Sequence, residues 1–280
     1  MLRLGSPAVP SDATLAVQVA RHRDGSASLC RDSVAREEPL EIQLGGASLA
    51  VVMRTPGHDA ELATGFLVTE RVVRGPEQIV SVRHCSQARI PEAAENVVQV
   101  VLAEGVQVDL EALRRNLYAS SSCGICGKAT LENALAVAPP LEDPSRFPAS
   151  FFYGLTEQLC AEQTVFSLTG GLHGAALFGS DGRLVVARED VGRHNAVDKV
   201  VGMALRSGRL PLQGHVLLVS GRISFEIAQK ALAARIPVVA AVSAPSSLAV
   251  ELATRAGLTL VGFLRGRSFN VYGARERVVG

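Results

Sequence analysis

The last third of the chain alternates short apolar runs with helical patterns, and this alternation constrains the fold more than any other feature. The apolar runs lie at 215–219, 237–242 and 258–264, and the helical patterns between them at 224–234 and 247–256. Runs of this kind, rich in valine and leucine and separated by helices, are typical of parallel strands buried on both faces. The sequence therefore predicts the α/β class, with a parallel sheet in this region.

The segments that follow these apolar runs are small and polar. They read Ser220-Gly221-Arg222, 243–246 and 265–268, and two of them lead into predicted helices. Ligands on such sheets bind at the carboxyl ends of the strands, and helix N-termini and arginine side chains there favour phosphates. An ordinary turn would explain each segment alone, but the three together predict an anion or nucleotide site.

A second feature is the pair Cys123 and Cys126, which lies in the serine- and glycine-rich segment 120–128. A helical pattern follows it at 128–135, so the thiols are expected on a loop at or before a helix N-terminus. The helix dipole and Lys128 both favour the thiolate, the form of cysteine that attacks other sulfur atoms. The pair is therefore predicted to act as a sulfur nucleophile.

Two other interpretations of the cysteine pair remain. Cys-x-x-Cys is also half of a zinc site or a redox pair. A structural zinc site would need a second ligand pair at similar spacing, and the sequence has none, because Cys30, Cys85 and Cys160 stand singly.

The first 115 residues are predicted to form a mixed, mainly antiparallel unit, which divides the chain into domains at 20–115 and 116–280. Gly45-Gly46 predicts a hairpin, and strands are expected at 13–19, 79–84, 96–102 and 106–110. Asp59 can cap a helix that carries Leu62 and Phe66. His58 is then either an exposed neighbour of this cap or a group that faces the cysteine loop.

Two further segments carry candidate groups. A glycine-rich turn at 169–177 holds His173, and a charged turn at 188–195 holds Arg193 and His194 ahead of a helix with an apolar stripe. Between them, Ser180-Asp181-Gly182 predicts a hairpin. The charged turn would be a solvated helix start if it had no further role. The dense clustering favours a role for Arg193 and His194 in the site.

Composition limits the partners. The net charge of +1 argues against nucleic acid or a membrane surface as the main partner, and no apolar run approaches membrane-spanning length. Five cysteines, an odd number, favour a reducing compartment, so a cytoplasmic location is expected.

Eight segments resemble the FdhD/NarQ family of formate dehydrogenase accessory sulfurtransferases, in the right order and over most of the chain. They are 37–40, 53–66, 122–128, 169–177, 188–199, 220–230, 242–252 and 259–272. The usual alanine after His173 is Gly174 here, a change that removes no functional group.

The resemblance implies a sulfur carrier that takes persulfide sulfur from a cysteine desulfurase onto Cys123, with Cys126 as helper or alternate carrier. The sulfur would pass to the molybdenum cofactor, a bis-molybdopterin guanine dinucleotide, for formate dehydrogenase. The resemblance also implies a cytidine-deaminase-like αβα sandwich and a possible homodimer, with no tightly bound metal of its own.

The segment 262–267 matches the cofactor-binding stretch of the family, which agrees with the nucleotide site predicted from the strand ends. With the candidates named above, the expected cofactor-binding residues are Ser220, Gly221, Arg222, His173, Arg193, His194, Gly262, Phe263, Leu264, Arg265, Gly266 and Arg267.

Two alternative functions remain. A zinc deaminase needs His-x-Glu and Pro-Cys-x-x-Cys, whereas this chain has Ala175 in place of the glutamate and Ser122 in place of the proline. A non-catalytic chaperone that only shields the molybdenum cofactor would need neither cysteine.

Overall fold

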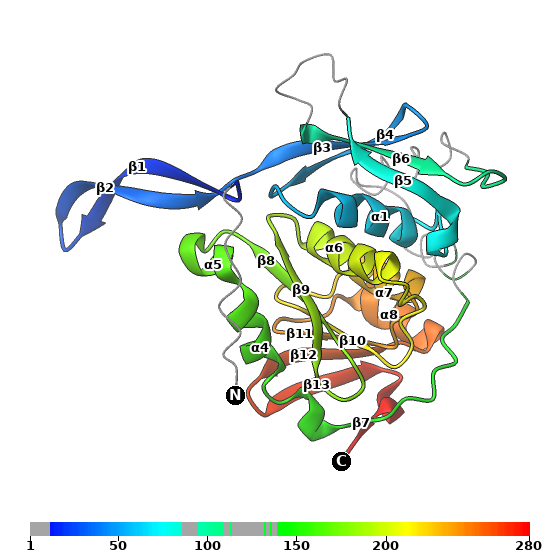
Figure 1. Cartoon of the computed structure of the whole chain (residues 1–280). Coiled ribbons are helices and arrows are strands. Elements are labelled where there is room, and N and C mark those ends of the chain that lie inside the picture. Colours follow the sequence, from blue (N-terminus) through cyan, green and yellow to red (C-terminus); the bar gives the residue numbers. More distant parts are fainter. Residues whose placement is uncertain (1–11, 86–94, 109–112, 114–131, 133–134, 136–138) are drawn as a thin grey trace, which may run out of the picture.

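The computed structural model describes residues 12–85, 95–108, 113, 132, 135 and 139–280, and it arranges them as two principal sheets with helices between and beside them (Figure 1). The strands are β1 (Thr14–Arg23), β2 (Ser26–Ala35), β3 (Glu38–Leu44), β4 (Ala47–Arg54), β5 (Ile79–His84), β6 (Val97–Leu102), β7 (Phe147–Pro148), β8 (His173–Phe178), β9 (Leu184–Asp190), β10 (Val216–Val219), β11 (Val238–Ala241), β12 (Thr259–Arg265), β13 (Ser268–Gly273) and β14 (Val278–Val279). The helices are α1 (Asp59–Thr69), α4 (Leu155–Glu162), α5 (Thr164–Thr169), α6 (Arg193–Arg206), α7 (Phe225–Ala233) and α8 (Ser247–Ala256), with short 3-10 turns η1 (Pro76–Gln78), η3 (Ala149–Phe152) and η4 (Arg275–Arg277).

The larger sheet has six strands in the order β13-β12-β11-β10-β8-β9. Strands β10, β11 and β12 are parallel, as the alternation of apolar runs and helices predicts, and α7 and α8 connect them. The β8–β9 hairpin, which the Asp181-Gly182 turn signal predicts, extends the sheet antiparallel to β10. The α/β class is therefore confirmed.

Alternate residues of the central strands face opposite layers. Leu217 and Val219 of β10 join the core beneath α6, α7 and α8, whereas Val216 and Leu218 pack with Phe152 and α4 on the other face. This alternation follows from the two-residue period of a strand, and it explains why all four residues are apolar. Helices cover both faces, and the likeness to cytidine deaminases stays a prediction.

The smaller sheet has the order β4-β3-β6-β5 and is mainly antiparallel, as expected, since only the β3–β6 pair is parallel. Its buried side chains, such as Leu40 and Val98, pack on α1, and α1 packs in turn on α6. Both sheets therefore share one hydrophobic cluster. The division of the chain into domains at residue 115 stays a prediction.

Helices α1 and α6 cross in backbone contact at two glycines. A Cβ built on Gly65 would lie 1.7 Å from the carbonyl oxygen of Asp198, and one built on Gly202 would lie 1.8 Å from that of Glu61. Real side chains do not approach so closely. Both positions therefore require glycine for the helices to pack as they do.

A buried ion pair joins these helices to α7. Lys230 of α7 donates to both carboxylate oxygens of Asp198 on α6, each at 3.0 Å, and to the hydroxyl of Thr69 on α1 at 2.9 Å. Burial alone would lower the pKa of Lys230, but the carboxylates of Asp198 and Glu70 outweigh it and raise that pKa. Lys230 is therefore charged and holds the three helices together.

The strand expected at 13–19 is confirmed as β1, which is longer than expected and pairs with β2 in a hairpin that projects from the body and is mostly exposed (Figure 1). Two other expectations for the first 115 residues were wrong. Residues 106–108 are not a strand, because the chain leaves the sheet through a turn in which Gly105 has a φ of 86°. The rest of that expected strand, 109–110, lies outside the described residues.

The cap expected at Asp59 also differs. His58 occupies the N-cap position of α1 with a left-handed φ of 59°, and its side chain makes no capping hydrogen bond. Asp59 is the first helical residue, and its buried carboxylate pairs with both Nε and Nη2 of Arg54, each at 3.0 Å.

None of the helices in the described ranges is both long and apolar enough to cross a membrane.

Candidate functional site

The strand directions bring the predicted site segments to one edge of the larger sheet. Parallel strands β10, β11 and β12 end there, and β9 runs in the same direction as β10, so Asp190 ends there too. Strand β8 runs in the opposite direction and begins there with His173. The segments after β9, β10, β11 and β12 and the start of β8 therefore surround one edge, which we call the site edge.

Gly221 lies between two of the candidate side chains. A Cβ added to Gly221 would lie 3.5 Å from Nδ1 of His173 and 3.8 Å from Cδ of Arg193. Ser220 fixes this arrangement, because its N–H donates to the carbonyl oxygen of Gly174 and its hydroxyl accepts from the N–H of Gly174, both at 2.9 Å. The structure thus brings together residues that the sequence separates by almost fifty positions.

The charged turn at 188–195 divides into a buried part and an accessible part. Asp190 is fully buried, and its carboxylate accepts hydrogen bonds from the N–H of Gly192 at 2.8 Å and from Nδ2 of Asn195 at 2.9 Å. Nζ of Lys199 lies 2.7 Å from the same carboxylate and also donates to the carbonyl oxygen of Thr55. These contacts hold the start of α6, so that Arg193 and His194 lie at the site edge.

Arg188 and Glu189 tie β9 to other elements. The guanidinium of Arg188 pairs with both carboxylate oxygens of Glu61 on α1, at 2.6 and 2.9 Å. Burial alone would raise the pKa of Glu61, but the hydrogen bonds from Arg188 and His58 together have the larger effect and lower this pKa to about 2. Glu189 accepts from the N–H groups of Val165 and Phe166 at the start of α5. Strand β9 is therefore anchored on both sides of the sheet.

His194 faces Glu226 of α7 at the site edge. Nε2 of His194 lies 4.0 Å from Oε2 of Glu226, and their side chains are 34% and 43% exposed. Burial, together with the charges of Arg193 and Lys230, lowers the pKa of His194 to about 4, so the imidazole is neutral at pH 7. Burial and Arg193 also lower the pKa of His173. The site edge thus offers two neutral imidazoles beside one guanidinium.

Strand β12 ends in a bulge that carries an unusual aromatic residue. Phe263 has a φ of 57°, a conformation that a bulky side chain rarely adopts, and its ring is 43% exposed. Its N–H donates to the carbonyl oxygen of Ser243, and a Cβ on Gly262 would lie 2.9 Å from Pro245. The bulge therefore seats the 262–267 segment against the loop that follows β11.

The remaining residues of that segment differ in position. Arg265, Gly266 and Arg267 are exposed, and the guanidinium of Arg267 lies 5.2 Å from the ring centre of Tyr153. Leu264 is buried among the apolar residues beneath the sheet, so its side chain faces the interior. Arg222 is exposed beside Gly221. The site edge therefore carries several exposed guanidinium groups, a type of group that proteins commonly use to bind phosphates.

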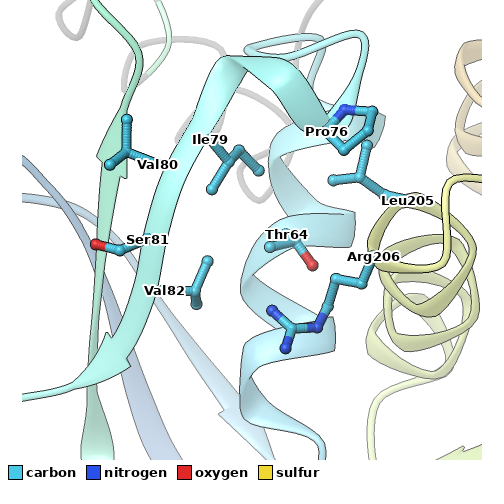
Figure 2. Close-up of a pocket in the computed structure, with 8 residues that line it drawn as sticks. All are labelled: Thr64, Pro76, Ile79, Val80, Ser81, Val82, Leu205 and Arg206. Atoms are coloured by element: carbon cyan, nitrogen blue, oxygen red, sulfur yellow. The ribbon is translucent and has the colours of Figure 1, made fainter.

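The described residues also form at least two hollows. One, of about 600 Å³, is lined by polar residues that include His58, Asp59 and His84. The other, of about 420 Å³, lies between β5, α1 and the last turn of α6, where Arg206 projects into it (Figure 2). No predicted cofactor-binding residue lines either hollow. Arg206 ends the helix that Arg193 begins, so the second hollow lies about 20 Å along α6 from the site edge.

The predicted nucleophiles Cys123 and Cys126 lie outside the described residues. Of the other cysteines, Cys30 and Cys85 are half-buried and Cys160 is exposed, and all three are free thiols. The described ranges contain no group of three or more histidine, cysteine, aspartate or glutamate residues placed to hold a metal ion.

Sequence reasoning did not single out Glu226. An acidic residue in the first turn of a helix is ordinary, because it complements the helix dipole. The available signals were its place in the family-like segment 220–230 and its position shortly after the 220–222 segment that follows β10. Its proximity to His194, which belongs to a different helix, is visible only in the structure.

The comparisons with known proteins agree on one family. The model of the FdhD/NarQ family matches residues 35–279. A relative named sulfur carrier protein FdhD from Streptomyces coelicolor is 54% identical, covering 93% of this chain and 94% of the relative. One of the same name from Mycolicibacterium paratuberculosis is 52% identical, covering 91% and 94%.

A solved structure is also similar. It is the crystal structure of a protein from Desulfotalea psychrophila described as a formate dehydrogenase accessory protein. The two chains superpose with a TM-score of 0.75 at 26% identity, covering 95% of this chain and all of the other.

Proposed function

Because the chain belongs to the FdhD/NarQ family, we propose that it is a sulfur carrier that activates formate dehydrogenase. It would accept sulfur from a cysteine desulfurase as a persulfide on Cys123 and deliver it to the molybdenum cofactor of the dehydrogenase. The names of the curated relatives support the role of sulfur carrier, and the description of the solved structure supports the link to formate dehydrogenase.

The observation that carries the proposal is the convergence of polar and cationic groups at the site edge. His173, Arg193 and Gly221 lie together, and β10, which precedes Arg222, and β12, which ends with Arg265, run to the same edge. Guanidinium groups, backbone N–H groups and helix N-termini are what proteins use to bind phosphates. A bis-molybdopterin guanine dinucleotide carries such phosphates, and it would be bound here as substrate.

The proposed sulfur transfer conserves atoms and electrons. The Cys123 thiolate attacks the outer sulfur of the desulfurase persulfide, the new S–S bond forms on Cys123, and the desulfurase thiolate leaves. Cys126 can then attack the inner sulfur of the Cys123 persulfide. This step forms a Cys123–Cys126 disulfide and releases the outer sulfur to the cofactor as sulfide, with its electron pair. A cellular thiol must reduce the disulfide before the next cycle.

The proposal has a direct test by mass spectrometry. The purified chain is incubated with a cysteine desulfurase and cysteine, and the peptide that holds Cys123 and Cys126 is weighed. We expect the mass of one added sulfur atom, its loss in Cys123→Ala, and no change in the control Cys160→Ala, which removes an exposed thiol elsewhere. No added sulfur on the wild-type peptide would contradict the proposal.

A second experiment separates a carrier from a chaperone. Formate dehydrogenase activity is measured in cells that express the Cys123→Ala/Cys126→Ala variant in place of the wild type. A carrier requires a thiol, so activity should be lost. Retained activity would favour a chaperone that only shields the cofactor.

The cofactor site can be tested apart from the thiols. Arg265→Ala should weaken binding of GDP, which represents the guanine nucleotide half of the cofactor, as measured by calorimetry. The control is Arg206→Ala, since Arg206 lies at the opposite end of α6. Equal affinity of the two variants for GDP would mean that the cofactor binds elsewhere on the chain.

The proposal includes the features expected from the sequence. The thiols require a reducing location, for which we propose the cytoplasm. We also propose a homodimer, and a cytidine-deaminase-like unit at 116–280 that carries both the cysteine loop and the cofactor site, with 20–115 as a smaller domain.

A further inference from the structure

The first turn of α7 places a carboxylate next to an imidazole without joining the two. The 4.0 Å between Nε2 of His194 and Oε2 of Glu226 is too long for a hydrogen bond. Nε2 of His194 and Nε of the adjacent Arg193 are both buried and lack any hydrogen-bond partner in the structure. Buried polar atoms are nearly always satisfied, so unsatisfied ones beside a ligand site indicate groups that the ligand itself completes.

The charge states make these two side chains complementary to one kind of ligand edge. Burial raises the pKa of Glu226, but the neighbouring hydroxyl of Ser224, the backbone N–H of Glu226 and the charge of Arg193 lower it overall. Glu226 is therefore a carboxylate that only accepts hydrogen bonds. His194 is neutral, so one ring nitrogen can donate a hydrogen bond without a charge.

We propose that Glu226 and His194 read the 2-amino-4-oxopyrimidine edge of the bound cofactor. This edge presents a ring N–H and an amino group, which the Glu226 carboxylate can accept together, next to a carbonyl oxygen, which can accept from Nε2–H of His194. Adenine has an unprotonated ring nitrogen where this edge has its N–H, so that nitrogen would face the carboxylate and be rejected. The inference rests on the proposed function, since it assigns the specificity-determining residues of the same site.

Two parts of a molybdopterin guanine dinucleotide carry this edge. The guanine base has it, and so does the pterin ring. The chemistry of recognition is the same for both, and separate ligands distinguish them: GDP represents the guanine, and 6-hydroxymethylpterin represents the pterin.

The test measures the affinity of the purified full-length chain for GDP, IDP and 6-hydroxymethylpterin by calorimetry. IDP differs from GDP only by lacking the 2-amino group. We expect the wild type to bind GDP about tenfold more tightly than IDP or better, and Glu226→Gln to bring this ratio close to one. The ratio is measured within one variant, so it does not depend on the fraction of the sample that is folded.

The matched control is Glu157→Gln, which removes an acidic residue from the first turn of α4 instead of α7. It should keep the wild-type ratio, because a loss of helix-dipole stabilisation alone does not distinguish GDP from IDP. If Glu226→Gln weakens binding of 6-hydroxymethylpterin and leaves the GDP-to-IDP ratio unchanged, the inference stands with the pterin as the ligand.

Two results would overturn the inference. If the wild type binds GDP and Glu226→Gln matches Glu157→Gln for all three ligands, only the assignment of Glu226 is wrong. If the wild type binds neither GDP nor 6-hydroxymethylpterin, the proposed cofactor site is wrong as well.

Discussion

Individual residues of the charged turn at 188–195 have two different roles, and the sequence could not separate them. Asp190 and Lys199 are buried and structural, whereas Arg193 and His194 lie at the site edge. The distinction depends on Thr55, which contacts both Asp190 and Lys199 from about 140 positions earlier. No local pattern reveals a partner so distant in the sequence.

Removing the positive charge of this buried pair should destabilise the fold. Lys199→Met leaves Asp190 as a buried carboxylate without its counter-charge, which typically costs about 3–5 kcal/mol. The free energy of unfolding, measured with urea, should fall by that amount. Arg206→Met, at the exposed end of the same helix, should change it by less than about 1 kcal/mol. Equal losses of unfolding free energy in the two variants would mean that the Lys199–Asp190 pair does not contribute specifically to stability.

The neutral state of His194 predicts a pH dependence of stability. Its pKa is about 4 in the folded chain, against an ordinary value of 6.5, so the unfolded chain binds the proton first as pH falls. Stability from this group is complete above pH 6.5 and is lost as pH falls from about 6.5 to 4. Urea unfolding of His194→Gln should show a flatter dependence in this range than the wild type. If the unfolding free energies of the two proteins changed with pH in parallel, the lowered pKa of His194 would be refuted.

At the scale of elements, the sequence predicted the strands, helices and hairpins that depend on local patterns of residues. The three parallel strands, the helices between them and the hairpins at Gly45-Gly46 and Asp181-Gly182 follow from apolar runs and turn residues. The β1–β2 hairpin was missed even though Asp24-Gly25 is a turn signal, because its exposed strands lack a continuous apolar face. The convergence at the site edge was predicted in part, from the rule for parallel strands. The contribution of β8 required the structure.

The crossing of α1 and α6 predicts that glycine-to-alanine substitutions there change the stability in the direction opposite to the usual one. Glycine-to-alanine changes inside helices normally stabilise by about 1 kcal/mol. Gly65→Ala and Gly202→Ala should instead destabilise by about 3 kcal/mol or more, because each new methyl group meets a backbone carbonyl of the other helix. Thermal melting of both variants checks this expectation. Gly221→Ala, whose added Cβ would meet nothing closer than 3.5 Å, is the control. A higher melting temperature for Gly65→Ala would contradict the packing.

At the scale of the whole molecule, the β1–β2 hairpin is an appendage of a compact body. Gln18 and Arg31 are paired across it, so the chain can be shortened by replacing 19–30 with a two-residue Asn-Gly turn. Most side chains removed are exposed, including Leu29 at 73%. The melting temperature should therefore change by only about 2 °C, as few buried contacts are lost. A fall of ten degrees or more would show that the hairpin stabilises the body.

The hydrophobic cluster shared by both sheets bears on how the chain is made. The hydroxyl of Thr69 on α1 bonds to Asp198 on α6, 129 positions later. A ribosome releases α1 long before α6 exists, so the apolar surface of the early helix stays uncovered for most of translation. Chaperones would therefore need to cover this surface in newly made chains during that interval.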